Sequence, residues 1–175
     1  QGDYDVDYFG NNVSINEDAS LIAIGTKNGY GDSETMQDVG YVKTYQYSET
    51  ENNWVQYGTT IYGESSGSRF GNVISLSNDG SILAINETGY QTGAGRVSIY
   101  NNDTENNEWV LYDNTTYVGS EGYQNLGHDI GLNNDGSVMV VVSVNNVGIN
   151  GNGYTSVYDI NLSLIHISEP TRPTP

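Results

Sequence analysis

The chain of 175 residues has no cysteine and few basic residues. Without cysteine, disulfide bonds and thiolate metal sites are excluded. Five Lys and Arg stand against 22 Asp and Glu, which gives a formal net charge of −17. Phosphates need Lys and Arg to neutralise them, so this balance disfavours nucleic acid and, equally, an anionic membrane surface. We interpret the acidic surplus as a solvated surface that keeps strand edges apart, rather than as a dedicated cation-binding surface.

Long apolar runs are absent as well. No stretch approaches the ~18 apolar residues of a transmembrane helix, so we expect no membrane insertion. No apolar period of 3.6 residues is long enough to predict a helix. No signal peptide is visible, but Gln1 is not a natural start, so we expect a fragment of a larger protein.

The main feature that is present is a repeat. The segment 70–85, Phe-Gly-Asn-Val-Ile-Ser-Leu-Ser-Asn-Asp-Gly-Ser-Ile-Leu-Ala-Ile, occurs three times. The other two copies begin at Phe9 and at Leu126. Such regular spacing, with a period of roughly 60 residues, predicts a repeat architecture.

Each copy predicts two strands joined by a tight turn. Apolar residues alternate in the first strand, and the residue between them is small, as in Ser14, Ser75 and Gly131. The small residue suggests that another sheet comes close on that face. Asp-Gly predicts a hairpin turn with positive φ, and Ala19 in the first copy predicts a strained or different turn. The second strand is apolar throughout, which is typical of a strand buried on both faces.

Two more strands complete each unit. The third begins at a Gly and carries a Tyr five residues later, and the fourth contains Trp54-Val55 or Trp109-Val110. Four-stranded sheets repeated radially make a β-propeller. We therefore predict an all-β fold, a partial β-propeller of three four-stranded antiparallel blades that form an open arc. The boundaries are 1–8 for the end of a preceding blade, 9–69, 70–125 and 126–162 for the blades, the third incomplete, and 163–175 for a tail.

A family resemblance rests on three stretches of the second unit. Phe70-Gly71 with the segment to Ile85, then Gly-Arg-Val-Ser-Ile-Tyr, then Glu-Trp-Val-Leu-Tyr resemble the FG-GAP-like propeller repeats of microbial and algal surface proteins. The resemblance covers roughly residues 1–160 and implies a propeller at the cell surface. Integrin-type repeats of this kind have a longer calcium-binding loop between their first two strands. Here that loop is a tight turn with one or two acidic residues, so the metal role is not carried over.

The last residues depart from the repeat. A Trp-Val strand is expected after Ile160, but the chain continues into a segment that holds all three prolines. Residues 163–175 resemble the translated read-through of a sequencing adapter. We expect this tail to be non-native.

The best candidate for an interaction surface is the set of loops between the second and third strands. They differ in length and charge at one topological position, and long loops on a rigid scaffold often carry binding sites. The candidate binding residues are Tyr30, Asp32, Glu34, Asp38 and Tyr90. A calcium site at these acidic residues, or at Asp3, Asp5 and Asp7, is the alternative to a solvated acidic loop, which we favour. We expect no cofactor.

Glycosylation sequons bear on the cellular location of the protein. Asn86, Asn102 and Asn114 each begin an Asn-x-Ser/Thr triplet at an expected loop or strand end. Together with the resemblance they favour an extracellular or cell-surface protein.

These features favour a non-catalytic binding or scaffold module that recognises protein or glycan through its blade loops. We expect Trp54 and Trp109 to pack between strands rather than to stack on sugars. No nucleophile with an adjacent base and no recognisable carboxylate pair is present, so we predict no enzyme. The alternatives are a calcium-dependent adhesive repeat and a propeller enzyme whose site lies in missing blades. Because terminal blades lack neighbours, we expect self-association through the open blade faces.

Overall fold

The structure is a computed structural model that describes residues 7–29, 37–120, 122–144 and 153–160. Its strands are β1 (Asn12–Ile15), β2 (Leu21–Gly25), β3 (Tyr41–Ser48), β4 (Asn53–Tyr62), β5 (Phe70–Leu76), β6 (Ile82–Glu87), β7 (Arg96–Asp103), β8 (Glu108–Val118), β9 (Asp129–Leu132), β10 (Val138–Val144) and β11 (Gly153–Asp159). One short helical segment, α1 (Tyr90–Gly93), lies between β6 and β7. The prediction of an all-β chain is confirmed.

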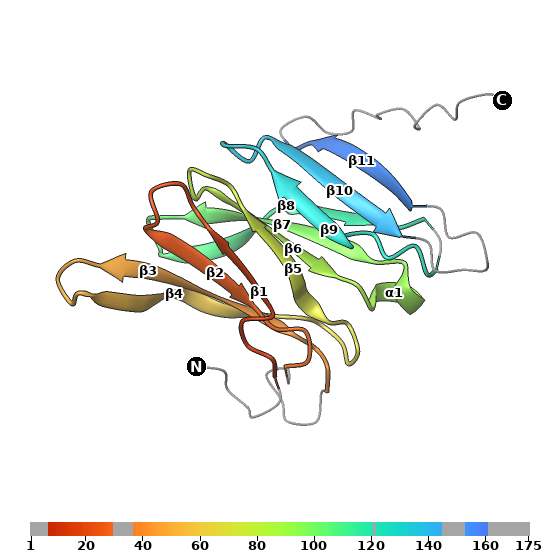
Figure 1. Ribbon diagram of the computed structural model, residues 1–175, viewed down its shortest axis with the longest axis horizontal. Coiled ribbons are helices and arrows are strands. Elements are labelled where there is room, and N and C mark those ends of the chain that lie inside the picture. The colour runs from red at the N-terminus through yellow and green to blue at the C-terminus, as the bar shows by residue number, and fades with distance from the viewer. Residues whose placement is uncertain (1–6, 30–36, 121, 145–152, 161–175) are drawn as a thin grey trace.

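The strands form three open antiparallel sheets. Their orders are β1-β2-β3-β4, β5-β6-β7-β8 and β11-β10-β9, so each strand pairs with its neighbour in sequence. Figure 1 shows the sheets in chain order, from the red and orange strands of the first to the blue strands of the third. Short turns between adjacent apolar runs leave the chain no other simple pairing.

The hairpin turns use the same side chain in all three copies. The carboxylates of Asp18, Asp79 and Asp135 each accept a hydrogen bond from the backbone N–H two residues later, at 2.9–3.0 Å. Gly80 and Gly136 adopt positive φ, as predicted, and Ala19 adopts the same left-handed conformation with φ 57°. The first turn is therefore of the same kind, with the steric cost that a Cβ brings there, about 1 kcal/mol.

The sheets pack face to face, which gives two apolar cores. The first core joins one face of the first sheet to the second sheet, and contains Leu21, Ala23, Val42, Tyr57, Phe70, Ile74, Leu76, Leu83, Ile85 and Trp109. The second joins the second sheet to the third, and contains Ile82, Ala84, Val97, Ile99, Leu126, Ile130, Met139, Val141 and Ile160. The middle sheet is covered on both faces, so every residue of β6 is buried. We call the face that a sheet turns toward the preceding sheet its N-side face, and the opposite one its C-side face.

The first strands of neighbouring sheets lie close together, as the small residues between their apolar positions predict. The backbone N–H of Leu76 donates to Ser14 Oγ at 2.9 Å, and that of Leu132 donates to Ser75 Oγ at 3.2 Å. A larger side chain at these positions would hold the strands apart. The small serine therefore both permits the approach and satisfies a backbone donor of the next sheet.

The Phe-Gly pair crosses the preceding sheet at close range. The backbone N–H of Phe70 donates to Val39 O at 2.8 Å, and that of Leu126 donates to Ala94 O at 3.0 Å. At this crossing a Cβ on Gly95 would lie 2.4 Å from the backbone N and O of Leu126. Only glycine fits there, which explains the glycine that opens the third strand.

Candidate functional site

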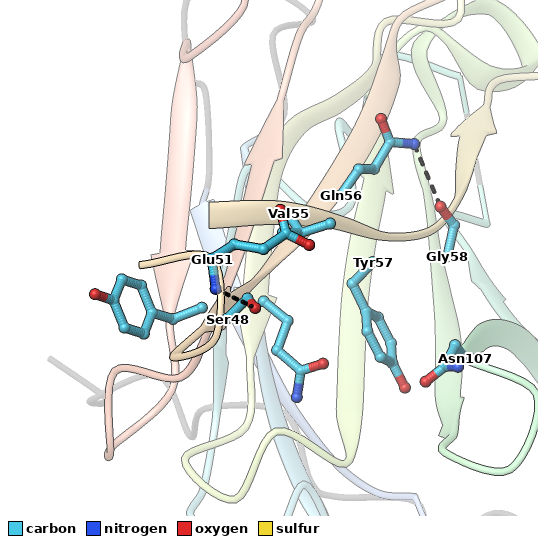
Figure 2. Close-up of a pocket in the computed structure, with 9 residues that line it drawn as sticks. Ser48, Glu51, Val55, Gln56, Tyr57, Gly58 and Asn107 are labelled. Carbon is cyan, nitrogen blue, oxygen red and sulfur yellow. Dashed lines mark hydrogen bonds between the residues drawn. The ribbon is translucent and has the colours of Figure 1, made fainter. Parts of the chain in front are cut away.

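A solvent-exposed groove of about 450 Å³ lies at the outer edge of the first sheet (Figure 2). Its polar and aromatic side chains come from β3, the β3–β4 turn, β4 and the β7–β8 turn: Gln46, Tyr47, Ser48, Glu51, Gln56, Tyr57 and Asn107. Figure 2 shows Tyr57 and Asn107 on one side of β4 and Gln56 on the other. The groove is thus built from two consecutive units of the repeat.

A second hollow, of about 270 Å³, adjoins the first. The two share Gln46, Tyr57 and Asn107, and the second also includes Asn16, Ser20, Asp79, Asn102 and Thr104. We call the two hollows together the edge groove. The described residues that line it provide amides, hydroxyls, two tyrosines and two carboxylates, and none of them is Lys or Arg.

Tyr57 fixes the geometry of the edge groove. Its side chain is 7% exposed, and its hydroxyl donates to Asn102 Oδ1 at 2.6 Å. Asn102 Nδ2 in turn donates to Gly80 O at 3.1 Å. Burial raises the pKa of Tyr57 above its usual value. The phenol therefore stays protonated and ties β4 of the first sheet to the second.

Trp109 also stabilises this junction between the first and second sheets. It is buried in the first core, and its indole Nε1–H donates to Thr44 Oγ1 at 2.9 Å. Its ring meets Tyr57 edge to face, with centroids 6.4 Å apart. The prediction that this tryptophan packs between strands is confirmed. Tyr47, in contrast, is 39% exposed, and its ring packs on the half-buried Trp54.

The residues predicted for the loop surface lie elsewhere. Tyr30, Asp32 and Glu34 fall outside the described residues. Asp38 is exposed with φ 53°, and its carbonyl accepts from Arg69 N at 3.0 Å. The guanidinium carbon of Arg96 lies over the ring of Tyr90 in α1, 4.3 Å from the centroid of that ring. Neither Asp38 nor Tyr90 lines the edge groove.

The loop region contains a buried ion pair that the sequence did not reveal. Glu87 is 1% exposed and pairs with Arg96, which also meets the exposed Glu64 at 3.1 Å. Burial raises the pKa of the Glu87 carboxyl, against the opposing attraction of Arg96. Thr26 and Ser143 occupy the equivalent positions in the other units, so the pair is specific to the second sheet. A glutamate in an apolar strand carries no local signal that would mark it as buried.

The three sequons have different surroundings. Asn86 is fully buried, its Oδ1 accepts from Val73 N, and its Nδ2 donates to Gly127 O at 2.8 Å. This placement leaves no room for a glycan on Asn86 in the folded chain. Asn102 is half-buried and bonded to Tyr57 as described. Asn114 lies in β8, and its side chain is outside the described part.

The acidic side chains do not gather into a metal centre in the described part of the chain. Among the described residues, no group of three or more His, Asp or Glu side chains is placed to hold a metal ion. Asp3 and Asp5 are outside that part, and the carboxylate of Asp7 accepts from Phe9 N and from the Tyr41 hydroxyl. No helix in the described ranges has the length and apolarity needed to span a bilayer.

Comparison with known proteins finds no matching family model and no matching curated protein.

Proposed function

We propose that this chain is a non-catalytic binding and scaffold module, formed by blades of a partial β-propeller, from a larger secreted or cell-surface protein. Its ligand is a neutral glycan held in the edge groove. The single observation that carries the proposal is the lining of that groove, which combines tyrosine rings with amide side chains and has no Lys or Arg among the described residues.

This lining suits sugar chemistry. A sugar offers hydroxyl groups on its edges and C–H groups on its faces. The amides of Gln46 and Asn107 each provide donors and an acceptor, which complement hydroxyl groups. The exposed ring of Tyr47 offers an apolar surface for a sugar face.

The charge of the protein selects among glycans. With a net charge of −17 and two carboxylates in the groove, sulfated or uronic-acid polymers would be repelled. Neutral oligosaccharides avoid this repulsion. The propeller part of the proposal draws support from the repeated face-to-face stacking of the sheets and from the close approach of their first strands.

The test is a screen of neutral oligosaccharides, followed by titration calorimetry on those that bind. Tyr47→Ala and Asn107→Ala should each weaken binding at least about tenfold, which corresponds to about 1.4 kcal/mol. Both positions are exposed, so the fold should survive the substitutions. Tyr123→Ala is the control, because Tyr123 is also exposed but lies outside the groove.

Two results would contradict the proposal. One is that no neutral oligosaccharide binds the wild-type chain. The other is that a ligand binds Tyr47→Ala and Asn107→Ala as tightly as it binds the wild type.

A further inference from the structure

The two ends of the stack of sheets present different apolar faces. At the first end, Val13 is 66% and Ile15 is 53% exposed on the N-side face of the first sheet. Their equivalents in the second sheet, Ile74 and Leu76, are each 5% exposed because the first sheet covers them. The same repeat position is thus buried wherever a preceding sheet is present.

The other end shows the complementary pattern. On the C-side face of the third sheet, Val140 is 39% exposed. Its equivalents Ala23 and Ala84 are fully buried beneath the following sheet. Val138 beside it is half-buried, whereas its equivalents Leu21 and Ile82 are buried.

On this end face, two residues that pair across the strands differ in size from their equivalents in the other sheets, one being smaller and the other larger. Ser14 pairs with Ala23 across the first two strands, Ser75 pairs with Ala84, and Gly131 pairs with Val140. The larger Val140 therefore stands beside a residue with no side chain. A Cβ on Gly131 would meet nothing within 4 Å, so the space in front of it is open. A terminal repeat that caps a stack has a polar outer face. The valine here leaves an apolar surface instead, on which another sheet can dock.

The internal interfaces show what fits each end. Twice within the chain, a C-side face packs on the N-side face of the next sheet. The two free ends are one face of each kind, so they are complementary to each other and not to themselves. A contact between them is heterologous, and it continues from copy to copy until it closes into a ring or forms a fibre.

We propose that copies of this chain associate head to tail, with the N-side face of the first sheet of one copy packed on the C-side face of the third sheet of another. The occupant of each end is a second copy. Ile15 and Val140, which test this inference, do not line the edge groove, so their substitution separates it from the glycan proposal. The net charge of −17 opposes the contact, so added salt strengthens it.

Two exposed positions give a decisive test on the full chain. Ile15→Glu blocks the N-side end, and Val140→Glu blocks the C-side end. Sedimentation velocity should show the wild type growing beyond its 19.0 kDa monomer with concentration, and each variant alone staying monomeric. An equimolar mixture of the two variants should form a dimer and nothing larger, because one intact end remains on each.

Controls separate the alternative contacts. Val110→Glu, at a 50% exposed position on β8, should associate like the wild type. Val13→Lys replaces Ile15→Glu if circular dichroism shows that the latter is unfolded. A wild type that is monomeric at every soluble concentration overturns the proposal. So does dimerisation of either single variant, which indicates a contact between like faces, or a mixture that stays monomeric.

Discussion

Ile24 and Ile85 are the same residue at the same position of two units, and they differ in what covers them. Ile85 is fully buried in the core between the first and second sheets. Ile24 is half-buried on the N-side face of the first sheet. Replacing each with alanine removes the same atoms from the same place in a strand. The difference between the two variants therefore measures the contribution of the neighbouring sheet.

The expected magnitudes follow from burial. Isoleucine to alanine in a packed core costs about 2–5 kcal/mol, from lost transfer energy and the cavity that remains. Ile24 lacks a neighbouring sheet, so Ile24→Ala should cost about 1 kcal/mol or less. The change in strand propensity is common to both and cancels. We expect Ile85→Ala to be less stable than Ile24→Ala by about 1 kcal/mol or more, which is the smallest difference between these two ranges.

Urea unfolding followed by tryptophan fluorescence provides the assay. With a slope of about 2 kcal/mol per molar urea, the difference moves the midpoint by roughly 0.5 M or more. The protein must be dilute, because association of copies would cover Ile24. Equal losses of stability in the two variants, or a larger loss for Ile24→Ala, would refute the face-to-face packing of the first two sheets.

Two further predictions concern the backbone crossing and the turns. In the same assay, Gly95→Ala should lower the free energy of unfolding by more than about 3 kcal/mol, because its Cβ would meet the backbone of Leu126. Gly10→Ala should lower it by only about 1 kcal/mol, for its positive φ, because no atom lies near its Cβ. Equal losses in the two variants would contradict the close crossing. Hydrogen bonds from Ser137 lower the pKa of the Asp135 carboxyl, so its contribution to stability is present above the unfolded pKa of about 4 and is lost as pH falls through the lower folded value. Asp135→Asn should therefore lose less free energy of unfolding than the wild type between about pH 5 and about pH 3. The measurement is urea unfolding at a series of pH values, and an equal loss in the variant and the wild type would contradict this.

The repeat made much of the fold predictable. Apolar alternation and Asp-Gly turns act locally, so the first two strands of each unit were placed correctly. The small residue of Ser14 and Ser75 also pointed to the neighbouring sheet, because a close approach leaves a visible mark in side-chain size. Ala19 shows the limit of such a rule, since the surrounding hairpin imposes the left-handed conformation on it.

The edge groove could not be predicted in the same way. It joins Tyr57 of one unit to Asn107 of the next, and their meeting depends on how the sheets stack and twist. Taken alone, the sequence pattern around each residue predicts only an ordinary strand or turn position. The sequon at Asn86 fails for a related reason, since the triplet does not encode whether the asparagine is buried.

The central claim, that consecutive units stack in chain order, has a direct test in the turns between the first two strands of each sheet. Glu17, Asn78 and Asn134 are equivalent positions there. Glu17 N donates to Asn78 O at 2.9 Å, and Asn78 Nδ2 donates to Asn134 Oδ1 at 3.0 Å. Because the chain has no cysteine, pairs of cysteines can be introduced cleanly and joined with a short bifunctional maleimide. In dilute protein, the pairs at 17 and 78 and at 78 and 134 should cross-link within one chain, whereas the pair at 17 and 134 should not. Efficient cross-linking of 17 to 134, or none at either adjacent pair, would contradict the stack.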